Sequence, residues 1–108
     1  HQADAVRALT GGDWHDVNGG GIDPRVPYLV RLPSGREITL FFYDGPASRA
    51  VAFEGLLRSG ERFAARLREL LGPSDEPQLA HIATDGETYG HHHRHGDMAL
   101  AYALRLID

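Results

Sequence analysis

The chain of 108 residues carries a net charge of −4 and contains no cysteine. Its length allows one domain at most, and a hydrophobic content of 42% is ordinary for a globular protein. The acidic balance argues against a nucleic-acid partner, and the lack of cysteine excludes disulfides and thiol catalysis. No apolar run is long enough to span a membrane, so we expect a cytoplasmic protein that makes no membrane contact.

The first 23 residues combine a short alanine-containing segment with a glycine-rich one. Residues 1–9 have weak helical character, and residues 10–23 favour a loop because Gly, Asp and Asn suit turns. Within this loop Trp14 either stacks on a sugar ring or covers an edge of the core, and we favour the second role. If His1 is a genuine amino terminus, its amine and imidazole could chelate copper, as in oxidative polysaccharide-cleaving enzymes.

Residues 28–43 predict a β-hairpin. Two arms with strand composition, residues 28–32 and 36–43, flank the turn formers Pro33, Ser34 and Gly35. The second arm ends in four consecutive apolar or aromatic residues, which is typical of a strand buried on both faces. We therefore expect this arm to lie near the middle of a sheet.

A long helical pattern follows the hairpin. Asp44 and Pro46 suit the start of a helix, and apolar residues spaced three and four apart continue from Ala47 to Leu71. Ser59-Gly60 in the middle of this segment either divides it into two helices or allows another element to pack closely. Gly72-Pro73 ends the pattern.

The last third of the chain predicts a strand and a helix. Residues 79–83 indicate a short buried strand, and a final helix begins at Gly96 or Asp97. The apolar side of that helix is expected to hold Met98, Leu100 or Ala101, Leu104 and Ile107. The order is β-β-α-β-α, and a strand, helix and strand in succession imply a parallel strand pair. Residues 1–108 are thus expected to form a single α/β unit.

The stretch from Thr84 to Asp97 holds three carboxylates, four histidines and an arginine. A strand that leads directly into Asp85-Gly86-Glu87 resembles the way in which α/β proteins present catalytic groups at the carboxyl edge of a sheet. Asp85 or Glu87 could then work as a general acid or base. The alternative is that these carboxylates only cap the following turn.

A metal site is a second interpretation of the same stretch. If the segment after Gly90 is helical, His91 and His95 lie four residues apart on one face and could share an ion. In this alternative, copper or zinc is bound by His91, His93 and His95 together with Asp85 or Glu87. The competing view is an exposed or hydrogen-bonded polar cluster without metal.

The residues Thr84-Asp85-Gly86-Glu87-Thr88-Tyr89-Gly90-His91-His92 are similar to the Asp-Gly-Glu-x-(Phe/Tyr)-Gly motif of family-57 glycoside hydrolases. The likeness is greatest to an uncharacterised branch related to α-amylase and α-mannosidase sequences. Residues 41–54 and 96–104 also resemble that branch, so the similarity covers most of the chain from about Gly21 onward.

This resemblance implies a partial (β/α) barrel-like sheet with packed helices, retaining action on α-glucan or a related polysaccharide, and no obligatory cofactor. By the motif, Asp85 would be the general acid/base, and Glu87, Tyr89 and His91 would shape the sugar subsite. Trp14 is a further candidate for binding carbohydrate.

The family's nucleophile is a Glu on an earlier strand motif, and Glu37 and Glu54 stand in a different context. The chain is also too short for a whole barrel, so it resembles the C-terminal part of a catalytic domain. Open sheet edges and apolar faces predict that such a piece, if stable alone, forms a homo-oligomer. The alternative function is a small histidine-rich α/β module that binds metal or carbohydrate.

Overall fold

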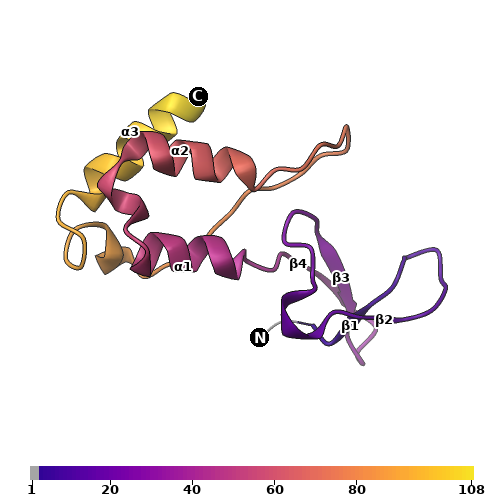
Figure 1. Cartoon of the computed structure of the whole chain (residues 1–108). Helices are drawn as coiled ribbons and strands as arrows, with labels where there is room; N and C mark the ends of the chain where they lie inside the picture. Colours follow the sequence, from indigo (N-terminus) through magenta and orange to yellow (C-terminus); the bar gives the residue numbers. More distant parts are fainter. Residues whose placement is uncertain (1–2) are drawn as a thin grey trace.

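The computed structural model describes residues 3–108 as an elongated molecule with extents of 47 × 30 × 24 Å. Short β-ladders occupy one end and three helices the other (Figure 1). The helices labelled η are of the 3-10 type. In chain order the elements are β1 (Ala5–Val6), β2 (His15–Asp16), η1 (Asn18–Gly20), β3 (Tyr28–Arg31), β4 (Glu37–Leu40), α1 (Gly45–Phe53), η2 (Leu56–Arg58), α2 (Gly60–Glu69), η3 (Gly86–Tyr89) and α3 (Gly96–Ile107).

The predicted hairpin is confirmed. Strands β3 and β4 pair antiparallel, with Tyr28 opposite Leu40 and Arg31 opposite Glu37, and the turn contains Gly35 at a φ of +80°. The expectation that the second arm is a central, buried strand is wrong. Strand β4 ends at Leu40, and its sheet has only two strands among the described residues. Phe41, the next residue, is 50% exposed. The aromatic residues after Leu40 lead into α1 instead of extending the sheet.

The first described residues form a strand where weak helical character was predicted. Strand β1 pairs antiparallel with β2, placing Ala5 opposite Asp16. The rest of residues 10–23 is mostly loop, as expected. Val17 and Ile22 are buried within it, and the Val17 N–H donates to the carbonyl of Asp4.

Local capping determines where the helices begin. The carboxylate of Asp44 accepts a hydrogen bond of 2.8 Å from the backbone N–H of Ala47, which starts α1. Gly55 adopts a left-handed conformation after α1, and the Ser59 hydroxyl then accepts from the N–H of Arg62 to begin α2. The predicted helix from Ala47 to Leu71 is therefore divided, which is one of the two alternatives left open for Ser59-Gly60.

The hydrophobic core lies among the helices. Gly60 lies against Tyr102 and the carbonyl of Ala99, so α2 and α3 approach closely at that point. Close packing at Gly60 thus accompanies the division of the helix. The buried core residues are Val51, Leu56, Leu57, Phe63, Ala64 and Ala103.

The predicted fold class is wrong. Residues 79–83 are extended but belong to no strand, and the two sheets found within residues 3–108 are antiparallel pairs. The polar backbone groups of this segment bond elsewhere: the Leu79 N–H donates to the Arg25 carbonyl, and the Ala83 N–H donates to the Ser48 hydroxyl. The described chain therefore contains neither a parallel strand pair nor a barrel-like sheet.

Helix α3 begins at Gly96 as predicted, but its buried face differs from the expected one. Ala103 is fully buried against α2, whereas Met98 and Leu104 are 63% and 54% exposed. Ala99 and Ala103 lie in this contact together with Tyr102, which packs over Gly60 of α2. Of the residues expected on the apolar side, Leu100 packs partly buried against the core, whereas Met98 and Leu104 remain outside.

A turn at Asp23 and Arg25 joins the β end to the helical end. The Arg25 side chain hydrogen-bonds to Asp23 and holds the pKa of that carboxyl below its usual value. The Pro24 carbonyl accepts a hydrogen bond of 3.0 Å from Nε2 of His81. Residues 79–81 are thus attached to this turn before the chain reaches Asp85.

Candidate functional site

Ser48 fixes the segment that leads to Asp85. Its buried hydroxyl donates to the Asp44 carbonyl at 2.7 Å and accepts from the Ala83 N–H at 3.0 Å. One side chain of α1 thereby holds the extended segment two residues before Asp85. The position of Asp85 consequently depends on α1 and not on a sheet.

A 3-10 turn then presents Asp85 to solvent. The Asp85 carbonyl accepts from the Thr88 N–H at 3.0 Å, and the Thr84 hydroxyl donates to the Tyr89 hydroxyl at 3.0 Å. The Asp85 side chain makes no capping hydrogen bond to η3. Its carboxylate is exposed and accepts no hydrogen bond from the residues that the structure describes, so the capping alternative does not explain it.

Asp85 lines a cavity of about 630 Å³ between α1 and the segment from Ala83 to Thr88. Two exposed aromatic side chains, Tyr43 and Phe53, stand on the α1 side together with Arg49. Phe53 is 81% exposed, which is unusual for a ring of that size. The whole lining consists of Tyr43, Gly45, Ser48, Arg49, Ala52, Phe53, Ala83, Thr84, Asp85, Thr88, His92 and His93.

The histidine loop is attached to the same helix. Nε2 of His93 donates a hydrogen bond of 2.7 Å to the Ala52 carbonyl in α1. The ring of His92 donates to the Glu87 carboxylate at 3.1 Å, and its centroid lies 5.1 Å from that of His91. These contacts give each of the three rings a neighbour within the protein.

A helix over residues 91–95 was the premise of the metal interpretation, and that premise is wrong. The segment consists of turns, because Gly90 has a φ of +157° and His95 adopts a left-handed φ of +64°. Helix α3 starts only after His95. Across residues 3–108, no group of three His, Asp or Glu side chains is arranged to hold a metal ion. His1, the proposed copper ligand, lies outside these residues.

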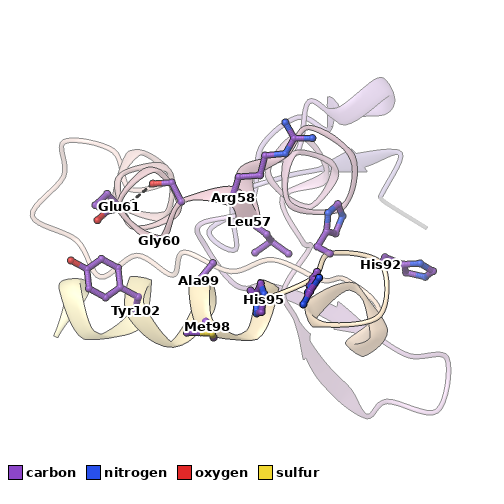
Figure 2. Close-up of a pocket in the computed structure, with 12 residues that line it drawn as sticks. Leu57, Arg58, Gly60, Glu61, His92, His95, Met98, Ala99 and Tyr102 are labelled. Carbon is purple, nitrogen blue, oxygen red and sulfur yellow. Dashed lines mark hydrogen bonds between the residues drawn. The ribbon is translucent and has the colours of Figure 1, made fainter.

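A second cavity lies beyond His92 and His93. It has a volume of about 830 Å³ and is bounded by the amino-terminal ends of α2 and α3 (Figure 2). Its lining includes Arg58, Arg94 and Glu61. Hydrogen bonds from the Glu61 backbone N–H and from the Ser59 hydroxyl hold the pKa of the Glu61 carboxyl below its usual value.

The other predicted sugar-binding residues do not line the Asp85 cavity. Tyr89 packs against the core, and Glu87 and His91 lie on the exposed side of the turn. Trp14 belongs to the β end, where it is 62% exposed with the Arg7 guanidinium 4.8 Å from its ring centroid. Trp14 therefore does not cover the core edge, which was its favoured role.

Several lining residues were not predicted from the sequence. Tyr43 was assigned to a buried strand, and Phe53 was correctly placed in a helix but given no role in a site. Arg49 and Phe53 lie four residues apart, which puts them on one face of a helix. That spacing, together with the helix start predicted at Asp44, could have indicated that Arg49 and Phe53 share a helix face near Asp85.

No family model, curated protein or solved structure matches the chain. Among residues 3–108, no helix combines the length and the apolar character needed to cross a bilayer.

Proposed function

We propose that this chain is the acid/base-bearing part of a retaining glycoside hydrolase, related to family 57, that acts on an α-glucan or a similar polysaccharide. One observation carries the proposal: the carboxylate of Asp85 is not engaged by protein groups and lines a cavity beside two exposed aromatic rings. The similarity of residues 84–92 to the family-57 motif supports the same role for Asp85.

The aromatic residues suit a sugar ligand. Exposed ring faces offer an apolar surface on which the C–H face of a sugar ring can pack. A cavity of about 630 Å³ is within the usual size range for small-molecule sites and can hold a short stretch of oligosaccharide. Arg49 in the lining can donate hydrogen bonds to sugar hydroxyls, and the second ring nitrogen of His92 can accept one.

In the proposed reaction Asp85 protonates the glycosidic oxygen as the bond to the leaving sugar breaks. The same carboxylate then takes a proton from water during hydrolysis of the glycosyl-enzyme intermediate. Retaining enzymes place a nucleophilic carboxylate about 5–5.5 Å from the acid. Asp85 is the single carboxylate in the described lining, so we assign the nucleophile to a residue outside this cavity wall.

Oligosaccharide binding tests the cavity without requiring the nucleophile. We expect maltoheptaose to shift the amide resonances of residues around Asp85, and Phe53→Ala to weaken its affinity about tenfold because a stacking surface is removed. Trp14→Ala is the matched control, since it removes an exposed aromatic ring at the other end of the molecule. Equal weakening by both variants, or no binding by the native chain, would contradict the assignment.

Catalysis tests the role of Asp85 itself. Any hydrolysis of an aryl α-glucoside should fall by about 10²–10⁴-fold in Asp85→Asn, because the amide cannot donate the proton. Glu87→Gln is the control in the same turn and should retain most of the rate. An Asp85→Asn chain that works at the parental rate would rule out the acid/base role.

A further inference from the structure

Helix α3 exposes three apolar residues along one side. Met98 and Leu104 are 63% and 54% exposed, and Ala101 between them is exposed as well. These positions are three residues apart and share one side of the helix. Figure 2 shows Ala99 and Tyr102 directed toward Gly60 of α2, whereas Met98 is directed elsewhere. The exposed face thus lies beside the α2 contact, and Met98 also lines the second cavity.

The residues on this face are arranged almost symmetrically about Ala101. Met98 lies three positions before it and Leu104 three positions after it, so residues of similar volume stand at equal distances. Asp97 and Arg105 lie four positions before and four after, with opposite charges. Both are exposed, and neither forms an ion pair with the residues that the structure describes. In both chain directions the face therefore shows a charged residue, a large apolar residue, alanine, a large apolar residue and a charged residue.

We propose that this face binds the same face of a second copy of the chain, with the two α3 helices antiparallel and crossing at Ala101. A two-fold axis through that point places Met98 opposite Leu104 of the other copy. It also places Asp97 of each copy opposite Arg105 of the other, which gives two such charge pairs. A parallel arrangement would instead bring like charges together, so charge complementarity selects the antiparallel one.

The geometry of the helix suits this contact. Twelve residues span about 18 Å, and the small side chain of Ala101 allows the two backbones to approach closely. One helix pair buries less than the roughly 1,600 Å² of a standard stable interface. The dimer should consequently be weak, with a Kd in the micromolar to millimolar range.

Sedimentation equilibrium of the 108-residue chain from about 10 µM to 1 mM tests the association. Ala101→Glu brings two negative charges together at the axis, and we expect it to raise the Kd at least tenfold. Ala65→Glu is the matched control, because Ala65 is an exposed alanine on α2. A native chain that stays monomeric at 1 mM, or Ala101→Glu with unchanged association, would overturn the proposal.

A charge exchange separates pairing from effects on the helix alone. Asp97 and Arg105 also complement the dipole of α3, so each single reversal weakens the helix as well as the dimer. Asp97→Arg and Arg105→Asp should each raise the Kd about tenfold, and the double variant should return it to within about threefold of the native value. A double variant weaker than both single variants would contradict the pairing.

The absence of cysteine makes crosslinking a direct test of register. The described chain has no thiol, so Ala101→Cys introduces a single one at the proposed axis. We expect it to form a disulfide-linked dimer at least tenfold faster than Ala65→Cys under the same mild oxidation. Equal rates would show that the two copies meet only by random collision.

Discussion

The hydroxyl of Ser48 connects two segments that lie 35 residues apart in the sequence. It is buried, and it satisfies the Ala83 N–H, which has no strand partner. The Asp44 carbonyl, its other partner, also accepts from the Ser48 backbone N–H, so that group stays bonded without the hydroxyl. The Ala83 amide therefore depends on Ser48 much more than the Asp44 carbonyl does.

Ser48→Ala should lower the free energy of unfolding by about 1 kcal/mol, because it removes one hydrogen bond and leaves a partly buried donor without a partner. Urea denaturation measures the loss, and hydrogen exchange at the Ala83 amide should become faster. Ser34→Ala in the exposed hairpin turn is the control and should change stability by less than about 0.5 kcal/mol. Unchanged exchange at Ala83 would show that the hydroxyl does not hold this segment.

Among the residues of the candidate site, the sequence identifies the carboxylate Asp85 more readily than the exposed aromatic residues Tyr43 and Phe53. Asp85 could be singled out because it follows an apolar run and because residues 84–92 resemble the family-57 motif. Tyr43 and Phe53 could not, because only tertiary structure shows which apolar side chains are exposed beside a cavity. Their part in the proposed site became visible only when α1 was placed beside Asp85.

Helices α2 and α3 meet where α2 begins. A methyl group at Gly60 would lie 2.6 Å from Cδ1 of Tyr102 and 3.1 Å from the Ala99 carbonyl oxygen. Tyr102 would have to move, and the two helices would separate. The contact between these elements thus requires glycine at this one position.

Gly60→Ala should destabilise the protein by about 1–2 kcal/mol, since overpacking at the helix contact outweighs the small gain in helix propensity at a first helical position. Thermal or urea unfolding measures the change. Gly45→Ala is the matched control at the first residue of α1, where the nearest atom, Cε2 of Tyr43, is 3.9 Å away. We expect less than about 0.5 kcal/mol there. A Gly60→Ala variant as stable as the native protein would show that Tyr102 adapts freely.

Element boundaries followed the sequence where a local interaction sets them. The cap at Asp44, the break before Gly60 and the start at Gly96 all depend on residues within one turn. The prediction of a strand over residues 79–83 was wrong, because a strand requires a neighbouring strand to pair with and apolar composition does not show whether one is present. The prediction of the buried face of α3 was wrong in part, because Ala99, Tyr102 and Ala103 face α2 while Met98 and Leu104 stay exposed.

At the scale of the whole molecule the chain is extended. Its radius of gyration is 16.4 Å, compared with about 13 Å for a compact domain of this length. Large buried side chains are concentrated at the helical end, where Phe63 and Val51 are fully enclosed. The β end buries little beyond Val17 and Ile22. Stability should therefore differ between the two ends.

Amide hydrogen exchange should reveal this difference. We expect the hydrogen-bonded amides of β3 and β4 to have protection factors at least about tenfold lower than those of α2, because few buried contacts oppose opening of the hairpin. Exchange followed by NMR at neutral pH and low temperature measures both sets in one sample. Similar protection along the whole chain would instead mean that both ends open only in global unfolding.

The overall shape was not predictable from the sequence. The β-β-α-β-α order assumed that successive elements share a sheet, and in the described chain residues 79–81 instead bond to the turn around Arg25. This connection depends on a backbone hydrogen bond and a side-chain hydrogen bond between residues far apart in the sequence. Hydrophobic periodicity in the sequence does not predict such long-range bonds.

Helix α1 has one face buried in the core and one face exposed beside Asp85. Ala47, Ser48 and Val51 are buried and hold the fold, while Arg49 and Phe53 stand in solvent beside Asp85. Under the proposed function, substitutions at positions 49 and 53 would change ligand preference at little cost in stability, because the residues that place Asp85 lie on the buried face of the helix. The proposed site could thus diversify by mutation without disturbing the fold.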